Sequence, residues 1–205
     1  MVEANASMAE EDQIYRPAKI VVIGDGGVGK TSLIKCYAED SFPEDHVPTI
    51  LDCYSAEVNI GANNDRTLAL QIWDSAGQDD YQRLRPLGYA NSDVFIICYA
   101  INDKVAFKSV ISKWLFELRT NASSVPIVLV ATKTDLRNPN DPNQVSSEEG
   151  KEVQVKHNFY SFVECSAKNL DNFQTPFKEA ITAVLKHRQK MKEKVRVKKS
   201  RCSIL

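Results

Sequence analysis

The sequence lacks any long hydrophobic run, since its longest uninterrupted apolar segment, residues 94–101, has eight residues. A helix needs about 20 apolar residues to cross a bilayer, so we expect no membrane span. The first twelve residues, MVEANASMAEED, also lack the basic and apolar regions of a signal peptide. Met1 is not followed by the glycine that N-myristoylation requires. We therefore expect a soluble, cytoplasmic protein.

Cysteine is scarce and is not arranged for metal binding or disulfide formation. The five residues include no CxxC pair and no spacing typical of a metal site. Cys36, Cys53, Cys98 and Cys165 lie in or beside apolar segments, where a free thiol packs as a small hydrophobic side chain. We expect these four cysteines to be reduced and buried.

The chain has no large excess of positive or negative charge, since its net charge is −1. The charges are nevertheless distributed unevenly along the sequence. Residues 186–201 carry nine Lys or Arg and one Glu, so this segment is +8 and the rest of the chain is −9. A basic segment on an acidic body predicts an anionic partner for that segment alone. Both an anionic membrane and a nucleic acid would satisfy this pattern.

Apolar runs alternate with amphipathic segments along the chain. Segments rich in Val, Ile and aromatic residues predict strands at 18–23, 51–60, 67–73, 93–101, 126–131 and 160–165. Helical spacing predicts helices at about 30–39, 81–90, 104–120, 146–157 and 176–193. Only the second and third strands are joined as a hairpin, through residues 61–65. This order predicts an α/β fold with a six-stranded, mostly parallel sheet, one antiparallel edge strand and helices on both faces.

Glycine is scarce, with eight residues, yet four of them fall within residues 24–29, GDGGVG. With Lys30 and Thr31, this segment matches GxxxxGK[ST] between a predicted strand and a predicted helix. Such a loop points successive backbone N–H groups at phosphate oxygens beside a helix N-terminus. Lys30 is placed for the β- and γ-phosphates and Thr31 for Mg²⁺. The segment therefore predicts a phosphate-binding P-loop.

A P-loop alone suits an ATPase, a small-molecule kinase or a GTPase, and later segments favour the GTPase. After the strand at 67–73 comes WDSAGQ, in which Asp74 can reach Mg²⁺ through water. In the same segment Gly77 can offer its N–H to the γ-phosphate, and Gln78 can orient the attacking water. No separate lid or second-substrate site for a small-molecule kinase is evident.

Two further strand ends indicate guanine. In TKTD, residues 132–135, the carboxylate of Asp135 can accept hydrogen bonds from both N1–H and the 2-amino group of guanine, a pair that adenine does not offer. In CSAK, residues 165–168, backbone N–H groups could meet the guanine O6. Either segment alone could be an ordinary turn, but their order after successive strands predicts guanine specificity.

The chain resembles the Ras superfamily of small GTPases, and within it the Rho/Rac family, over about residues 17–190. The Rho-like segments are PTILDCYSAEV after the first helix and DDYQRLRPLGY after WDSAGQ. The resemblance implies a P-loop NTPase fold, the small G domain, at 16–189. A flexible extension precedes it at 1–15, and a polybasic tail, predicted to be disordered until it is bound, follows at 190–205.

The resemblance also implies roles for individual residues. Phe42 would pack against the base, Thr49 would coordinate Mg²⁺, and residues 44–54 and 76–89 would be the two switches. The predicted catalytic residues are Gln78, Lys30 and Thr49, the metal ligands Thr31 and Thr49, and the effector-reading residues Asp52 and Tyr54. The residues assigned to the nucleotide are Gly24, Asp25, Gly26, Gly27, Val28, Gly29, Lys30, Thr31, Ser32, Phe42, Thr49, Asp74, Gly77, Thr132, Lys133, Asp135, Ser166, Ala167 and Lys168.

Several positions depart from the Rho pattern. His46 stands where Rho proteins usually have Tyr, and Leu51 stands where they usually have Phe, both in the segment that effectors read. Only 28 residues separate Asp135 from Glu164, and one helix, one strand and a turn fill them. We therefore expect the extra Rho insert helix to be absent.

The function that the resemblance implies is a switch that binds GTP and GDP with Mg²⁺ and hydrolyses GTP slowly. Its implied partners are an exchange factor, a GTPase-activating protein, a dissociation inhibitor and effectors, including effectors of the actin cytoskeleton. The alternative is a GTP-locked binding module that does not turn over. Gln78 and Gly26 favour the enzyme, because Gly26 leaves space where a side chain would crowd the transition state.

The last four residues, Cys202-Ser-Ile-Leu, form a CaaX box whose final Leu favours geranylgeranylation. One lipid alone gives marginal anchoring, and a polybasic patch supplies the second signal. The sequence therefore predicts lipid anchoring on the cytoplasmic face of the plasma membrane or endomembranes. On this interpretation the basic tail binds anionic lipid and no nucleic acid.

Overall fold

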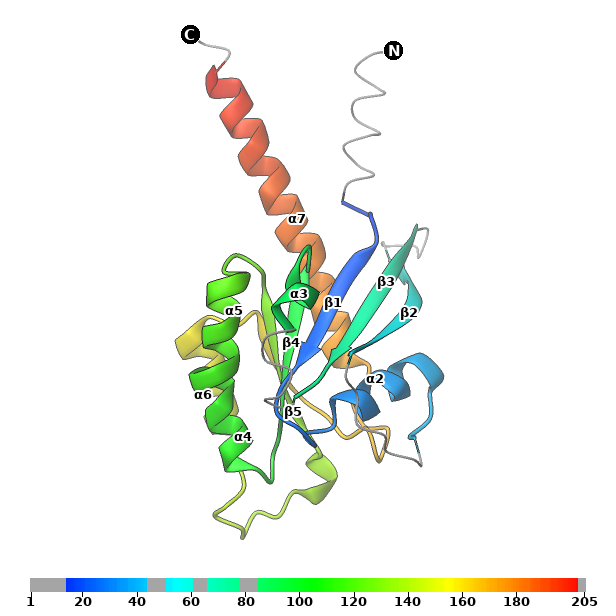
Figure 1. The fold of residues 1–205 in the computed structure, drawn as a ribbon, viewed down its shortest axis with the longest axis vertical. Helices are drawn as coiled ribbons and strands as arrows, with labels where there is room; N and C mark the ends of the chain where they lie inside the picture. Colours follow the sequence, from blue (N-terminus) through cyan, green and yellow to red (C-terminus); the bar gives the residue numbers. More distant parts are fainter. Residues whose placement is uncertain (1–13, 44–50, 61–65, 78–84, 203–205) are drawn as a thin grey trace.

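One sheet runs through the centre of the molecule in the computed structural model, which describes residues 14–43, 51–60, 66–77 and 85–202, with side chains up to residue 194. Its strands are β1 (Ala18–Ile23), β2 (Leu51–Ile60), β3 (Arg66–Ser75), β4 (Val94–Ala100), β5 (Ile127–Thr132) and β6 (Ser161–Glu164). They form a six-stranded sheet in the order β2-β3-β1-β4-β5-β6 (Figure 1). β2 pairs with β3 antiparallel at one edge, and the other neighbours are parallel. The predicted fold class is confirmed.

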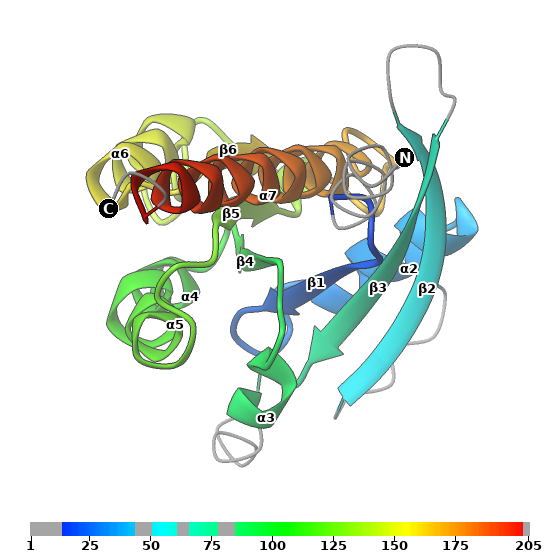
Figure 2. The same cartoon turned by 90° about the horizontal axis from the view of Figure 1, so that it is seen from above.

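Helices cover both faces of this sheet. They are α2 (Lys30–Glu39), α3 (Arg85–Tyr89), α4 (Lys104–Ser109), α5 (Phe116–Asn121), α6 (Ser147–His157) and α7 (Thr175–Cys202). A π-helical segment, η2 (Val110–Leu115), joins α4 to α5, and a short 3₁₀ turn, η3 (Thr134–Leu136), follows β5. Figure 2 shows α4 and α5 on the side of the sheet opposite α7. In the part of the chain that the structure describes, no helix combines the length and apolarity of a membrane span.

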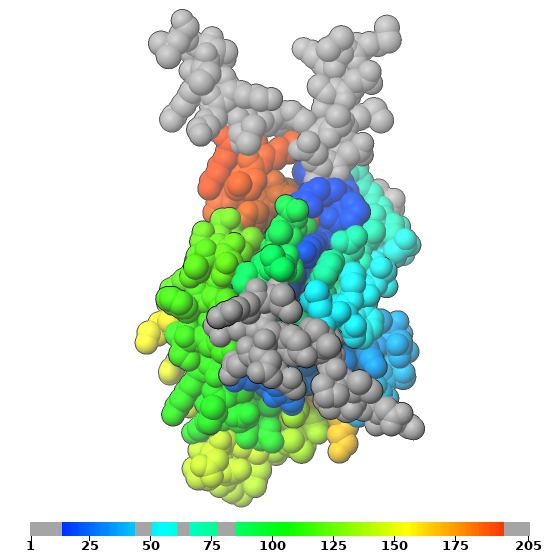
Figure 3. All heavy atoms as spheres, viewed as in Figure 1, coloured from blue at the N-terminus to red at the C-terminus, as the bar shows by residue number. Residues whose placement is uncertain are grey.

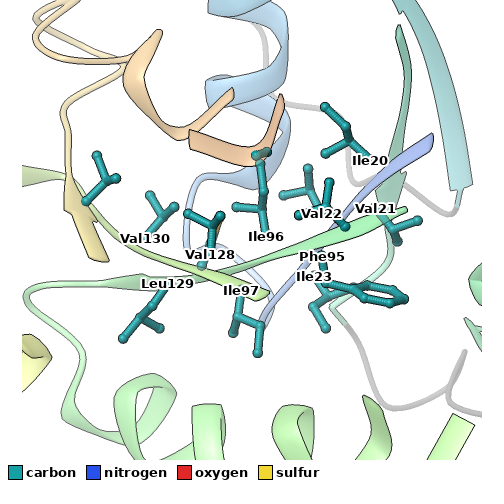
Figure 4. Packing of buried hydrophobic residues seen from close by; sticks show 14 of the residues in the cluster. Ile20, Val21, Val22, Ile23, Phe95, Ile96, Ile97, Val128, Leu129 and Val130 are labelled. Carbon is teal, nitrogen blue, oxygen red and sulfur yellow. The ribbon is translucent and has the colours of Figure 1, made fainter. Parts of the chain in front are cut away.

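The core lies on both faces of the central strands. β4 is buried at every position, and β1 and β5 are buried at all but one. Side chains that alternate along each strand point to opposite faces, and Figure 4 shows Ile20, Ile96 and Val128 on the side opposite Ile97 and Leu129. Burial on both faces explains why these strands read as continuous apolar runs. Such a sheet holds its strand ends, and the loops that leave them, in fixed positions.

Most predicted elements are present with small shifts at their ends. The strands agree with prediction to within two residues. The predicted helix at 104–120 is present but contains the π-helical turn η2, and of the predicted helix at 81–90 the structure describes Arg85–Tyr89. Between η3 and α6, a segment that the structure describes completely, no helix is present. The absence of the Rho insert helix is thus confirmed.

The end of the chain differs from the prediction. Residues 190–202, predicted to be disordered, continue α7 as helix. No Pro or Gly occurs between residues 177 and 202, and Lys, Arg, Glu, Gln and Met all favour helix. The first half of α7 is fixed by packing, because Phe177, Ala180 and Val184 are buried against the sheet. The second half extends away from the domain (Figure 1).

Arg188 fastens the N-terminal segment to α7. Its guanidinium donates hydrogen bonds to the carbonyls of Ile14, Arg16 and Pro17 at 2.7–3.0 Å and pairs with Asp93 at 2.9 Å. The side chain is only 8% exposed, and burial lowers the pKa of Arg188 while Asp93 opposes that shift. One of the nine basic residues at 186–201 is therefore committed to the fold rather than offered to a partner.

The cysteine prediction is correct for three residues and wrong for one. Cys36, Cys98 and Cys165 are buried, and burial raises the pKa of Cys165 to about 12, so this thiol stays protonated. Cys53 is exposed. The reason is its position on the outermost strand, β2, whose odd-numbered residues from Leu51 to Asn59 are exposed.

Candidate functional site

The P-loop lies between the end of β1 and the start of α2, as predicted. Gly24 has a φ of 143°, and a Cβ there would lie 2.2 Å from the carbonyl oxygen of Cys98 on β4. No other residue type fits this position without moving the backbone. The chain then turns through Gly29, which forms the N-cap of α2, so the helix begins at Lys30. The loop therefore lies against the carboxyl ends of the central strands with the helix N-terminus beside it.

Lys30 crosses the loop from the first turn of α2. Its ammonium group donates hydrogen bonds to the carbonyls of Gly24 at 2.9 Å and Asp25 at 2.8 Å, and the residue is 6% exposed. Burial lowers the pKa of Lys30, and the nearby carboxylate of Asp74 opposes that shift. This arrangement holds a positive charge at the centre of the P-loop, where phosphate oxygens can take over its hydrogen bonds.

Thr31 and Asp74 form an oxygen pair beside Lys30. The Thr31 hydroxyl donates to the Asp74 carboxylate at 2.5 Å, and Asp74 is fully buried at the end of β3. Mg²⁺ prefers oxygen ligands and is usually held by one or two protein oxygens together with substrate phosphates and water. A hydroxyl and a carboxylate on the edge of a phosphate-binding loop fit this ion. The other predicted metal ligand, Thr49, lies outside the described residues.

Gly77 lies directly against the P-loop. A Cβ at this position would meet the backbone of the loop at 2.4–2.5 Å, at the carbonyl carbon of Asp25, the carbonyl oxygen of Gly24 and the nitrogen of Gly26. Gly77 is thus required for close backbone contact, which brings the segment after β3 against the P-loop. The predicted catalytic residue Gln78 follows immediately but lies outside the described residues.

The residues predicted to bind the base meet at the ends of β5 and β6. The Ser166 hydroxyl donates to Asp135 Oδ1 at 2.6 Å and accepts from the backbone N–H of Asn169 at 3.1 Å. This contact orients the Asp135 carboxylate, which keeps lone pairs free for further donors. Two predicted site residues are 31 positions apart in sequence but adjacent in the fold, as expected for neighbouring parallel strands.

Thr132 and Lys133 tie the base-binding segment to the P-loop. The Thr132 hydroxyl is within hydrogen-bond distance of the carbonyls of Val28 at 2.5 Å and Tyr99 at 3.0 Å. The Lys133 ammonium donates to the carbonyl of Gly27 at 2.6 Å. The two loops that would bracket a nucleotide are therefore connected directly.

The remaining predicted residues lie around this centre. Ser32 is half-buried in the first turn of α2, Phe42 is 42% exposed beyond its end, and Lys168 is exposed after β6. The carbonyl of Ala167 accepts from the Cys36 thiol at 3.5 Å, which joins this loop to α2.

The predicted effector-reading residues lie on the edge strand. Asp52 is exposed and Tyr54 is half-buried on β2. In the ladder Asp52 pairs with Asp74 of β3. The residues predicted to contact an effector therefore lie on the strand next to β3, directly opposite the residue predicted to reach Mg²⁺.

Sequence reasoning missed a chain of contacts that leads from the P-loop toward α3. The Trp114 indole N–H donates to Asp25 Oδ1 at 2.8 Å, and Lys113 lies 3.7 Å from the same oxygen. The Arg85 guanidinium stacks over the Trp114 ring at 4.7 Å. The sequence carried no signal for these contacts. Lys113 and Trp114 both lie in the π-helical turn η2, which no periodicity argument predicts.

Arg85 also belongs to a buried polar cluster. Its Nε–H donates to Glu117 Oε1 at 3.2 Å and its Nη2 donates to Glu117 Oε2 at 3.0 Å. The Tyr89 hydroxyl donates to Glu117 Oε1 at 2.5 Å. Burial and the Glu117 charge both raise the pKa of Tyr89, so it remains a donor. The cluster links α3, which lies at the end of the predicted second switch, to α5. The sequence signal that could have identified this cluster is the carboxylate of Glu117, which stands next to the apolar Leu118 at a buried helix position.

Comparison with known proteins agrees with this geometry. Residues 19–186 match the model of the Ras family. The Ras-like GTP-binding protein RhoL of Drosophila melanogaster is 44% identical over 169 residues, which cover 82% of this chain and 87% of that protein. The Rho-related protein racC of Entamoeba histolytica is 38% identical over 187 residues, which cover 86% of this chain and 94% of that protein.

Proposed function

This chain belongs to the Ras family of small GTPases and is of the Rho/Rac type, and on that basis we propose that it is a switch that binds GTP and GDP with Mg²⁺ and hydrolyses GTP slowly. The observation that carries the proposal is the convergence of three groups at one sheet edge. They are the Lys30 ammonium within the P-loop, the Thr31 and Asp74 oxygens, and the Asp135 carboxylate held by Ser166.

Each group has a distinct part in binding. The backbone N–H groups of the P-loop and Lys30 bind the β- and γ-phosphates, while Asp135 accepts from the guanine base. Thr31 and Thr49 would hold Mg²⁺, with Asp74 reaching it through water, and the ion would neutralise charge on the phosphates. Gly77 offers its N–H to the γ-phosphate, so the second switch is ordered only when that phosphate is present.

Hydrolysis requires a water in line with the γ-phosphate, and Gln78 is the residue placed in sequence to orient it. Gly26 leaves room for the transition state. With no arginine finger evident in the sequence, intrinsic turnover is slow, and an arginine supplied by an activating protein accelerates it by roughly three to five orders of magnitude. An exchange factor, a dissociation inhibitor and effectors complete the proposed cycle.

We expect Gln78→Leu to bind GTP and Mg²⁺ like the wild type but to hydrolyse GTP at least about a hundredfold more slowly in the presence of an activating protein, because the water loses its orienting amide. Release of phosphate from preloaded GTP measures the rate. Gln71→Leu, at an exposed position on β3, is the matched control and keeps wild-type turnover. Equal rates for Gln78→Leu and wild type would remove Gln78 from catalysis.

We further propose that the protein is anchored on the cytoplasmic face of a membrane. Two additive terms support this: a prenyl group on Cys202 and the basic residues that precede it. Each buried CH₂ contributes about 0.8 kcal/mol, and each basic residue near an anionic leaflet up to about 1 kcal/mol. The helical form of α7 limits the second term. Each residue of a helix adds about 1.5 Å to its length, and the side chains point in all directions around it. Some basic residues therefore lie farther from the membrane surface than a Debye length of about 8 Å.

We expect Cys202→Ser to abolish stable membrane binding, with Cys53→Ser, at the exposed cysteine of β2, as the matched control that retains it. A second variant neutralises four basic residues of the tail: Lys194, Arg196, Lys198 and Lys199. We expect it to bind membranes more weakly and with little dependence on salt. Co-sedimentation of the prenylated protein with neutral and anionic liposomes over a salt series checks both. Binding indifferent to lipid charge and salt would assign the basic residues to another partner.

A further inference from the structure

A cavity of about 670 Å³ opens at the end of the molecule opposite the nucleotide site. It is lined by residues of η2 and α5, the segment before β5, the segment between α6 and β6, and α7. The nucleotide residues follow the carboxyl end of β5, whereas the cavity lies at its amino end. A strand of six residues is about 20 Å long. The cavity therefore shares no residue with the site described above.

Apart from Tyr160, the titratable residues that line this cavity are all basic. Arg119 of α5, His157 of α6, and His187 and Lys190 of α7 line it, and among the described lining residues there is no Asp or Glu. Buried Leu118 and Phe159 contribute to its floor. Figure 3 shows the surface of α7, in orange, directly above the green surface that includes α5. The basic side chains come from separate helices but line one cavity.

Neighbouring groups reinforce this positive field. Lys186 lies with its ammonium 5.5 Å from the ring centre of Tyr160, another lining residue. The pKa of His157 is lowered by burial and by the charges of Lys156 and Arg119. A histidine whose protonation is opposed by nearby cations reports the positive potential that an anion would relieve.

We propose that this cavity is an anion site that binds a polyphosphorylated inositol headgroup. The volume lies within the range of small-molecule sites, about 300–1,000 Å³, and exceeds what one phosphate fills. Four basic side chains from three helices can contact several phosphates at once, with Arg119 able to bind one of them through two donors. α7 leaves the domain at this end (Figure 1), so a headgroup bound there lies beside the helix that leads to Cys202.

Calorimetric titration of the full chain with soluble inositol trisphosphate, at about 0.15 M salt to screen the tail, tests the site. We expect binding that shifts the ring signals of His157 and His187 in NMR spectra. The double variant Arg119→Gln/Lys190→Gln should bind roughly tenfold or more weakly, because it loses two charge-assisted contacts. The matched control Lys108→Gln/Lys178→Gln removes the same charge from exposed positions on α4 and α7 and should bind like the wild type.

A second arm identifies the source of the headgroup. Phosphatidylcholine vesicles with and without phosphatidylinositol bisphosphate are compared for the same three proteins. Preferential binding to the phosphoinositide vesicles, lost in the cavity variant, identifies a lipid headgroup, while binding of the soluble probe alone identifies a free inositol phosphate. Absence of binding in both arms, or equal affinity of cavity and control variants, overturns the proposal. GTP retention, measured in parallel, stays unchanged throughout, so the outcome is independent of the nucleotide site.

Discussion

Asp135→Asn is expected to lose GTP binding and to gain binding of xanthosine triphosphate. The carboxylate of Asp135 accepts from two donors of guanine, and an amide presents a donor where the second acceptor was. A hydrogen bond to a charged group contributes about 1.5–3 kcal/mol, and a buried donor left unsatisfied costs about 1–3 kcal/mol more. The loss of one bond and the new pair of facing donors therefore weaken GTP binding by about 10²–10⁴-fold. Xanthine has a 2-oxo group in place of the amine, and the new amide can donate to it. Competition of both nucleotides against a fluorescent analogue measures the change.

The structure supplies a control for this experiment. Asp171 lies nearby, its backbone bridged to Ser166, but its side chain is exposed and is not predicted to contact the base. Asp171→Asn should therefore keep wild-type selectivity. Unchanged GTP affinity in Asp135→Asn would show that this carboxylate does not bind the base, and the role of Ser166 in orienting it would fall as well.

Lys30→Met is expected to lower the affinity for GTP and GDP by about 10²–10⁴-fold, because the charge that contacts both the β- and γ-phosphates is removed. The methionine is nearly as long as the lysine stem, so the space is filled. The carbonyls of Gly24 and Asp25 lose their donor, but backbone N–H groups of the loop remain. Nucleotide dissociation rates, measured in excess Mg²⁺, check the effect.

Lys35→Met is the matched control, since Lys35 lies on the same helix and is only half-buried. It should leave nucleotide affinity within about twofold of wild type, as expected for a surface substitution away from the site. Thermal unfolding of both variants without nucleotide separates a folding defect from a binding defect. Wild-type affinity in a folded Lys30→Met protein would contradict the assignment of the P-loop lysine.

The sequence predicted which candidate residues the fold brings together, where those residues follow strand ends. Parallel strands bring their carboxyl ends to one edge of a sheet, so residues after β1, β3, β5 and β6 had to meet there. The contact between Asp135 and Ser166 and the packing of Gly77 on the P-loop follow from that rule. The mostly parallel direction of the strands followed from the alternation of apolar and amphipathic segments, whereas their order in the sheet was not predicted.

Other features depend on how helices pair in three dimensions, which periodicity does not encode. The contact of Trp114 with Asp25 requires the register of η2, and the cluster of Arg85 with Glu117 requires α3 to pack on α5. The exposure of Cys53 depends on β2 being the edge strand, whose odd-numbered residues are exposed. Residues 190–202 were predicted to be disordered because chain ends are poorly ordered unless they are held, but their residue types favour helix.

The contacts of Trp114 and Arg85 also suggest how the P-loop and the second switch are connected. Trp114 in η2 contacts both Asp25 of the P-loop and Arg85 of α3. Direct contacts therefore join Asp25 of the P-loop to the polar cluster of Arg85 and Glu117. Such contiguous contacts are the physical route by which a local change reaches a second element.

The most direct test of the proposed switch is a time course of the nucleotide bound to the protein after loading with GTP and Mg²⁺, with and without a Rho-type activating domain. The account predicts retained GTP that converts slowly to GDP, acceleration of roughly 10³–10⁵-fold by the activating domain, and no retention of ATP in a parallel sample. Retention of ATP as readily as GTP, or bound GTP that never converts even with the activating domain, would contradict it.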